Sequence, residues 1–227
     1  MIKKLKWDSE FFGYDVGKVV IEENQVVSEQ ELIKESYPFK LVYIFSDIKL
    51  DFKHFKSKLV DIKITFYKKQ LAWEENPEFI HCKDEPAACN NLKQLALESG
   101  VFSRFKRDNN FTNNEFEKLY SQWINDSIKK INADHIIVYK ENNICKGFVS
   151  LKFQKEIAEI GLMAVDEDSR GEGIGLTLLG FINNLSRSKG FPEMRVTTQF
   201  ENIPAMQLYE KAGYTILSKQ YIYHLWN

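Results

Sequence analysis

The sequence predicts an α+β fold in which helices flank a mixed, mostly antiparallel sheet. Runs with the alternation of strands and runs with the apolar spacing of helices follow one another along the 227 residues. The asparagine pair at 142–143 joins two strand-like runs, which is typical of a tight antiparallel hairpin. A glycine-rich segment, 166–175, separates a strand-like run from a helix-like run. These observations predict an α+β domain with an additional, smaller α/β region before it.

The smaller N-terminal α/β region is expected over residues 1–75. Its predicted elements are strands over 16–21, 41–45 and 60–67 and a short helix over 29–36. Prolines stand near the ends of the next segment, 76–85, at Pro77 and Pro86. Because proline interrupts regular structure, this segment is expected to connect the two halves of the chain.

Apolar spacing and stop signals predict the elements of the second half. The predicted helices span 87–99, 114–131, 176–188 and 202–212, and the predicted strands span 136–140, 145–153, 158–165, 194–199, 214–218 and 220–226. Gly100 and Gly190 follow two of these helices as stop signals. Asn202 precedes the last helix as a cap, and a proline stands in the first turn.

The composition excludes several classes of partner. The formal net charge is −1, so no global field is expected to recruit nucleic acid or an anionic membrane. No apolar run approaches a membrane span, and residues 1–6 lack the apolar core of a signal peptide. Cys82, Cys89 and Cys145 lack metal-ligand spacing and are expected to be reduced thiols. The protein is therefore expected to be cytoplasmic and to use no metal.

The segment Asp166 to Gly175 is predicted to bind a phosphate through its backbone. Its core pattern is Arg170-x-x-Gly173-x-Gly175. Glycines remove the Cβ atoms that would keep a phosphate away, and N–H groups at the start of the following helix can point at the anion. The glycine order differs from the dinucleotide-binding pattern, and no Gly-Lys-Ser/Thr follows as in a P-loop. A tight connection between strand and helix is the alternative interpretation.

A second motif, near the C-terminus, narrows the interpretation of the glycine-rich loop to one family of proteins. Residues 202–214 read Asn-Ile-Pro-Ala-Met-Gln-Leu-Tyr-Glu-Lys-Ala-Gly-Tyr. The succession of strand, Arg-x-x-Gly-x-Gly loop, helix, strand and this segment resembles the GNAT superfamily of N-acetyltransferases over roughly residues 79–227. The resemblance implies the GNAT fold, acetyl-CoA as co-substrate without a metal, and a homodimer as one assembly state.

The resemblance also implies where the donor binds. The backbone of Met163, Ala164 and Val165 would pair with the pantetheine arm, and an N–H near Leu162 to Ala164 would polarise the thioester carbonyl. The pyrophosphate would lie on Arg170, Gly171, Gly173, Ile174 and Gly175. Asn202 matches an asparagine that contacts the pantetheine or diphosphate, and it also suits a plain helix cap. The strand residues suit an apolar core equally well.

Three residues are candidates for proton transfer. Tyr209 matches the tyrosine that superfamily members place beside the CoA sulfur as general acid, although a core aromatic on a helix would look the same. Glu159 stands where several members place a catalytic base, while others use ordered water. Asp61 is a weaker carboxylate candidate for the base.

Segments outside the CoA motifs suggest the acceptor. Residues 7–13, 103–105, 120–124, 147–151 and 195–199 resemble those of GNAT enzymes that acetylate the 4-amino group of dTDP-4-amino-4,6-dideoxygalactose. That resemblance implies a nucleotide-linked amino sugar as partner, held by Arg104, Trp123 and Gln199, with the N-terminal region contributing to the acceptor site. A solvated basic loop and a core tryptophan are the alternative reading. An amino acid, polyamine or aminoglycoside acceptor stays open, as does a CoA-binding module without catalysis.

Overall fold

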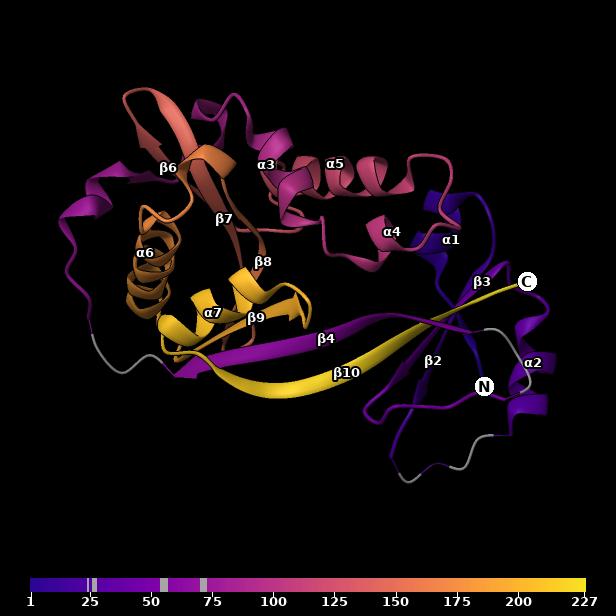
Figure 1. The fold of residues 1–227 in the computed structure, drawn as a ribbon. Helices are drawn as coiled ribbons and strands as arrows, with labels where there is room; N and C mark the ends of the chain where they lie inside the picture. Colours follow the sequence, from indigo (N-terminus) through magenta and orange to yellow (C-terminus); the bar gives the residue numbers. More distant parts are fainter. Residues whose placement is uncertain (24, 26–27, 54–56, 70–72) are drawn as a thin grey trace. The chain divides into compact units, whose positions relative to one another are not determined.

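The computed structural model describes residues 1–23, 25, 28–53, 57–69 and 73–227, and these form two compact units (Figure 1). The first unit comprises Met1–Ile64, Gln199–Glu201 and Ser218–Asn227, and the second comprises Thr65–Thr198 and Asn202–Leu217. The units are not consecutive stretches of chain, because the C-terminal residues belong with the N-terminal ones.

The first unit is a small α/β layer. Its elements are β1 (Lys3–Lys4), α1 (Lys6–Phe12), β2 (Val16–Ile21), α2 (Glu29–Ser36), β3 (Leu41–Ser46) and parts of β4 (Lys58–Lys69) and β10 (Thr215–Trp226). Strand β2 pairs in parallel with β3, and β3 pairs antiparallel with the end of β10. Leu32 of α2 packs on Val42, Ile44 and Tyr223 to form the core of this unit. All six residues of β3 are buried.

The second unit contains the larger part of the sheet, in the order β10-β4-β9-β8-β7-β6-β5. The strands not yet bounded are β5 (Cys82–Lys83), β6 (His135–Glu141), β7 (Ile144–Gln154), β8 (Ile157–Val165) and β9 (Glu193–Gln199). Strands β6, β7 and β8 are antiparallel neighbours, whereas β8 and β9 run parallel. The predicted hairpin is confirmed: Asn142 and Asn143 have φ values of 49° and 65°, the left-handed pair that a tight hairpin turn requires.

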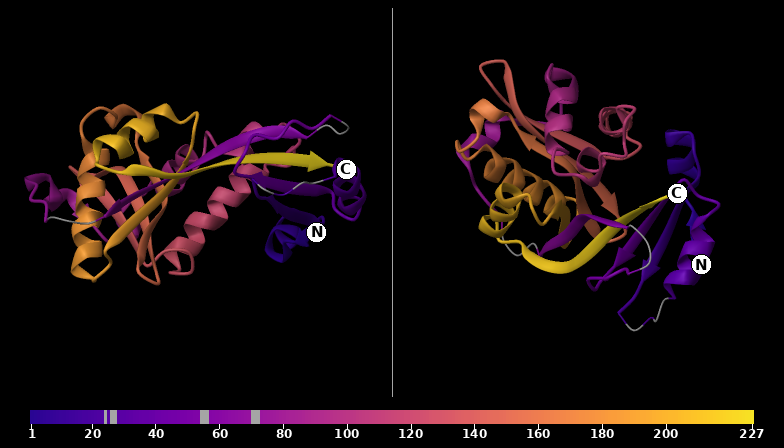
Figure 2. Two further views of the ribbon diagram at one scale, coloured as in Figure 1. Left: turned by 90° about the horizontal axis from the view of Figure 1, so that it is seen from below. Right: turned by 45° about the vertical axis from the view of Figure 1, so that its right-hand side comes forward.

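Helices cover both faces of the second unit's sheet (Figures 1 and 2). The helices are α3 (Leu92–Ser99), α4 (Arg104–Arg107), α5 (Glu115–Ile128), α6 (Ile174–Ser188) and α7 (Ile203–Lys211), with short 3-10 turns at Pro77–His81, Pro86–Ala88 and Glu167–Ser169. Leu95 of α3 and Ile124 of α5 pack on one face, in a cluster with Phe148. Ile174 and Leu178 of α6 lie against Gly147 on the other.

Most predicted elements are confirmed, and three need correction. The C-terminal residues form one long strand, β10, and not two, because the backbone stays extended from Thr215 to Trp226 without a turn. The helix predicted from residue 87 begins at Leu92, because Pro86–Ala88 forms a separate 3-10 turn. Residues 101–112, between the first two predicted helices of this half, contain the short helix α4, which the sequence did not predict.

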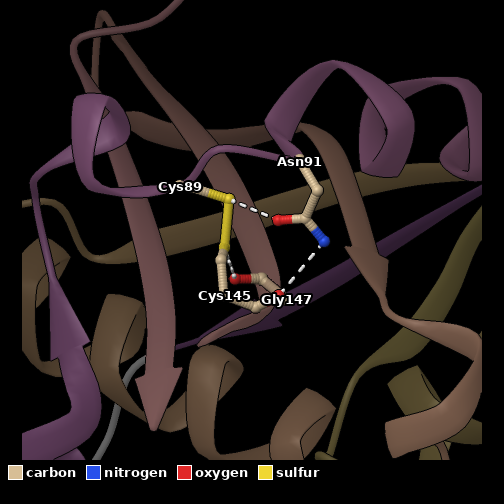
Figure 3. Close-up of a disulfide and its surroundings, with 4 residues drawn as sticks. All are labelled: Cys89, Asn91, Cys145 and Gly147. Carbon is tan, nitrogen blue, oxygen red and sulfur yellow. Dashed lines mark hydrogen bonds between the residues drawn. A yellow bond between two sulfur atoms is a disulfide. The ribbon is translucent and has the colours of Figure 1, made fainter. Parts of the chain in front are cut away.

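The expectation of three reduced thiols is wrong for two of them. Cys89 and Cys145 form a disulfide that ties the segment before α3 to β7 (Figure 3). Asn91 lies beside it and donates from Nδ2 to the Cys145 carbonyl at 3.2 Å. Sequence spacing could not reveal this pair, because 56 positions separate the two cysteines and only the packing of α3 on the sheet brings them together. Cys82 is a free, buried thiol.

Within the described ranges of the chain, every helix is too short or too polar to span a lipid bilayer.

Candidate active site

Strand β8 is open along half of its length in the middle of the sheet. It pairs with β9 only from Ile157 to Ile160, opposite Glu193 to Val196. Beyond that point β8 continues to Val165 with β7 as its neighbour, and the residues from Gly161 onward are no longer buried. An internal strand would normally be covered on both edges, so the separation of β8 from β9 leaves a backbone edge available to an extended ligand.

The glycine-rich loop follows the open strand directly. Gly171 and Gly173 adopt φ values of 87° and 86°, a left-handed conformation that strains other residues. The N-cap residue of α6 is Gly173, which has no side chain to cap the helix. The first N–H groups of an uncapped helix lack partners within the helix and carry its positive partial charge, so this end suits an anion. These residues would fit a pyrophosphate, and its binding at this loop stays a prediction.

The charged side chains around the loop form ion pairs. Arg170 donates from Nε to the Val165 carbonyl at 3.2 Å, and its guanidinium lies 3.3 Å from a Glu98 oxygen. Glu172 of the loop would repel a phosphate, but the Lys146 amine lies 3.1 Å from it. The carboxylates of Glu141 and Glu172 raise the pKa of Lys146, which keeps a positive charge beside the loop.

Helix α7 brings the second motif to the loop. Asn202 caps it by accepting a hydrogen bond from the Ala205 N–H at 3.3 Å, so the cap role predicted for this residue is observed. Tyr209 lies on the same helix and is 5% exposed, with its ring packed against Phe66 and Tyr214 at centroid distances of 5.7 and 5.9 Å. Burial raises the pKa of the Tyr209 phenol, so the phenol holds its proton more firmly than a tyrosine in water does.

The two carboxylate candidates lie in different units. Glu159 is exposed on the paired part of β8, in register with Lys152 and Arg195, two residues before the strand opens. Asp61 lies on β4 in the first unit. Glu159 is therefore the carboxylate that lies on the same strand as the open edge.

The structure brings two of the three acceptor candidates together. Arg104 lies over the ring of Phe105, with 4.5 Å from its Cζ to the centroid, and Trp123 meets the same ring edge-on at 6.0 Å. Trp123 also packs on Tyr120, so this tryptophan stands partly exposed in an aromatic cluster of α4 and α5. Gln199 ends β9 and belongs to the first unit.

Two polar residues of the site escaped sequence reasoning. Glu98 pairs with Arg170 from 72 positions away, and Ser150 of β7 is hydrogen-bonded to the backbone of Leu162 in the open strand. Both contacts depend on how α3 and β7 pack, so no local sequence pattern could predict them. Among the described residues, no group of three or more His, Cys, Asp or Glu side chains could hold a metal ion.

Comparison with known proteins gives the family. Residues 101–214 match the acetyltransferase (GNAT) family. Spore coat polysaccharide biosynthesis protein SpsD of Bacillus subtilis is 24% identical over 155 residues, which cover 68% of this chain and 53% of that protein. dTDP-fucosamine acetyltransferase of Escherichia coli O6:H1 is 30% identical over 133 residues, which cover 57% of this chain and 56% of that protein. The chain thus spans about half the length of these curated relatives.

A solved structure agrees on the fold. The GCN5-related N-acetyltransferase of Sphaerobacter thermophilus superposes with a TM-score of 0.51 at 14% identity, covering 86% of this chain and 64% of that chain. This likeness concerns the fold alone and confirms the fold class that the sequence predicts.

Proposed function

Because the chain belongs to the acetyltransferase (GNAT) family, we propose that it transfers the acetyl group of acetyl-CoA directly to a primary amine. The observation that carries the proposal is the continuity of the open edge of β8 with the uncapped N-terminus of α6. An extended amide-containing arm that ends in a pyrophosphate needs a free strand edge followed by an anion site, and β8 and α6 provide the two in that order.

The donor-binding residues follow from this arrangement. Met163, Ala164 and Val165 lie on the open part of β8, and the backbone groups of this stretch that face the open edge are proposed to pair with the pantetheine arm. The N–H groups at the start of α6, with Gly171, Gly173 and Arg170, are proposed to hold the pyrophosphate. The cap made by Asn202 is compatible with a further contact to the donor.

Acetyl-CoA supplies the acetyl group as a thioester, and the protein has two protons to move. Glu159, or a water that it orders, is the candidate to accept the proton that the amine loses as the C–N bond forms. Tyr209 is the candidate to donate a proton to the sulfur as the C–S bond breaks, because a tyrosine phenol is protonated at neutral pH. Solvent then restores the proton to the phenol. The transfer needs no covalent enzyme intermediate.

We further propose a nucleotide-linked amino sugar as the acceptor, most specifically the 4-amino group of a dTDP-4-amino-4,6-dideoxyhexose. The names of both curated relatives concern sugars or polysaccharides, which supports this class. Arg104 offers a cation for a diphosphate and Trp123 a partly exposed ring for an apolar wall. A contribution from Gln199 and from the N-terminal region stays a prediction.

The reaction is tested through Tyr209. Tyr209→Phe should lower kcat strongly and leave the Kd for CoA nearly unchanged, because only the hydroxyl is removed. Release of CoA thiol measures kcat, and calorimetry measures Kd. Tyr214→Phe is the matched control, because Tyr214 is a neighbouring buried tyrosine. An unchanged kcat in Tyr209→Phe would exclude the acid role.

A panel of acceptors tests the amine. Thiol release should be fastest with dTDP-4-amino sugars and slower with amino acids, polyamines and aminoglycosides. CoA binding without release on any amine would instead indicate a CoA-binding module. Sedimentation of the purified chain tests the homodimer that the family resemblance implies.

A further inference from the structure

Ser150 of β7 contacts the open strand at the point where its pairing becomes irregular. Its hydroxyl accepts a hydrogen bond from the Leu162 N–H at 2.7 Å and lies 3.4 Å from the Leu162 carbonyl oxygen, to which it can donate. Ser150 is 2% exposed. The side chain therefore satisfies both backbone groups of one residue in β8, where a backbone partner would normally do so.

The irregularity is a bulge with an extra residue in β8. Val149 pairs with Met163 and Leu151 with Ile160, so two residues of β8 stand opposite Ser150 alone. One of those two is Gly161, and a Cβ there would lie 2.9 Å from the Ser150 hydroxyl oxygen. The missing side chain of Gly161 and the hydroxyl of Ser150 are thus complementary across the two strands.

The bulge determines which backbone groups face the open edge. The Leu162 N–H donates to the Ser150 hydroxyl, and the Asp166 N–H donates to the Lys146 carbonyl. Ser150 and Lys146 both belong to β7, so the backbone groups of Leu162 and Asp166 face that strand. Successive residues of a strand point their backbone groups to alternate edges, so Ala164 also faces β7. Its carbonyl oxygen does lie toward Gly147 of β7, 2.9 Å from where a Cβ of that glycine would be.

The same alternation leaves two residues of β8 facing the other way. Met163 and Val165 direct their N–H and carbonyl groups toward the edge that lacks β9. The Val165 carbonyl accepts a hydrogen bond from Nε of Arg170, in the loop that follows β8. Of the three N–H groups at Leu162, Met163 and Ala164, only that of Met163 points to the open edge of β8, which β9 does not cover.

We propose that Ser150 is a positioning residue for acetyl transfer. By holding Leu162 against β7 it keeps the bulge in place, and the bulge presents the Met163 N–H to the carbonyl oxygen of the bound thioester. Negative charge develops on that oxygen as the C–N bond forms, so a fixed donor there lowers the barrier. This role rests on the proposed function and goes beyond it by naming the donor and the side chain that orients it.

The test combines kinetics with a spectroscopic signal. Ser150→Ala should lower kcat about 10-fold to 100-fold, less than the direct loss of an oxyanion donor, and should change the Kd for CoA little. The carbonyl stretch of bound acetyl-CoA labelled with ¹³C at the thioester should lie below its solution frequency in the wild type and return toward it in Ser150→Ala. Ser186→Ala is the matched control, because Ser186 is a fully buried serine of the same unit whose hydroxyl has no hydrogen-bond partner among the described residues. It should leave both readouts unchanged.

Gly161→Ala supplies a second, opposite perturbation. Its added Cβ meets the Ser150 hydroxyl, so kcat should fall in the wild-type background. In Ser150→Ala the hydroxyl is gone, and the same substitution should then have little further effect. If Ser150→Ala does not fold, the kcat and carbonyl stretch of Gly161→Ala decide.

The outcomes separate the two proposals. A wild-type chain that binds no CoA would overturn the proposed function itself. A wild-type chain that binds CoA and releases thiol, with kcat and carbonyl stretch unchanged in Ser150→Ala or, failing that, Gly161→Ala, would overturn the role of Ser150 alone.

Discussion

Gly175, in the first turn of α6, lies directly against Leu208 of α7: a Cβ at Gly175 would stand 3.0 Å from the Leu208 Cδ2 atom. This contact joins the phosphate loop to the helix that carries Tyr209. The absence of a side chain at Gly175 therefore serves packing between α6 and α7, in addition to any approach of a phosphate.

Gly175→Ala is expected to affect the reaction through that contact. The added methyl group must displace Leu208, at about 1–3 kcal/mol of overpacking, and a shift of α7 would move Tyr209. We expect kcat to fall, and Gly175→Ala combined with Leu208→Ala to recover part of it, because the second change makes room. Thiol release measures both, and no recovery in the double variant would contradict the packing explanation.

Gly173 and Gly190 provide a matched pair at the two ends of α6. Both have left-handed φ values, 86° and 82°, and both have open space around the missing Cβ. Substitution by alanine should therefore destabilise the protein similarly in each case, by about 1–2 kcal/mol. Only Gly173→Ala should weaken CoA binding, by about tenfold or roughly 1.4 kcal/mol, because Gly173 shapes the anion site. Equal CoA affinities for the two variants would contradict this assignment.

Glu159→Gln tests the base. If the carboxylate accepts the amine proton, kcat should fall about 10²-fold or more, whereas CoA affinity should hold. Glu156→Gln is the control, because Glu156 is another exposed glutamate, in the turn just before β8. An unchanged rate in Glu159→Gln would leave ordered water as the base.

The disulfide predicts a definite thiol count. Denatured protein should show one reactive thiol, from Cys82, before reduction and three after it. Replacing both Cys89 and Cys145 by serine should lower the free energy of unfolding by about 4 kcal/mol on the chain-entropy estimate for a sequence separation of 56. Reductant should destabilise the wild type and leave the double variant unaffected. Three thiols in the unreduced protein would contradict the bond.

The buried phenols predict a loss of stability at alkaline pH. Burial raises the pKa of Tyr209, and burial together with the neighbouring Tyr209 and Glu74 raises that of Tyr214. Above about pH 10 the unfolded chain loses these protons while the folded chain keeps them, so the free energy of unfolding falls as pH rises. Below that pH the contribution is fully present. Urea unfolding from pH 8 to 11 should show a shallower fall in Tyr214→Phe than in the wild type, and equal slopes would contradict the assignment.

Local sequence was sufficient for much of the fold and for the donor motif. The hairpin at 142–143 followed from two asparagines that tolerate left-handed φ, and the loop at 170–175 followed from glycines that do the same. The cap at Asn202 and the amphipathic helix α5 are also local patterns. Such features depend on neighbours in the chain, which a single sequence displays.

Long-range contacts could not be foreseen. The disulfide between Cys89 and Cys145 and the ion pair between Arg170 and Glu98 each join distant segments. The bulge at Ser150 has no signature in sequence, because a strand with an extra residue reads like one without it.

The sequence by itself predicted the family, a glycine-rich loop between strand and helix and a tyrosine on the last helix, because backbone conformation and motif order are encoded locally. Only the tertiary structure decided at which residue β8 leaves β9, that the Ser150 hydroxyl bonds Leu162 beside a bulge and that Met163 turns its N–H to the open edge. These features depend on which edges of a strand find partners, and that is settled when the sheet assembles.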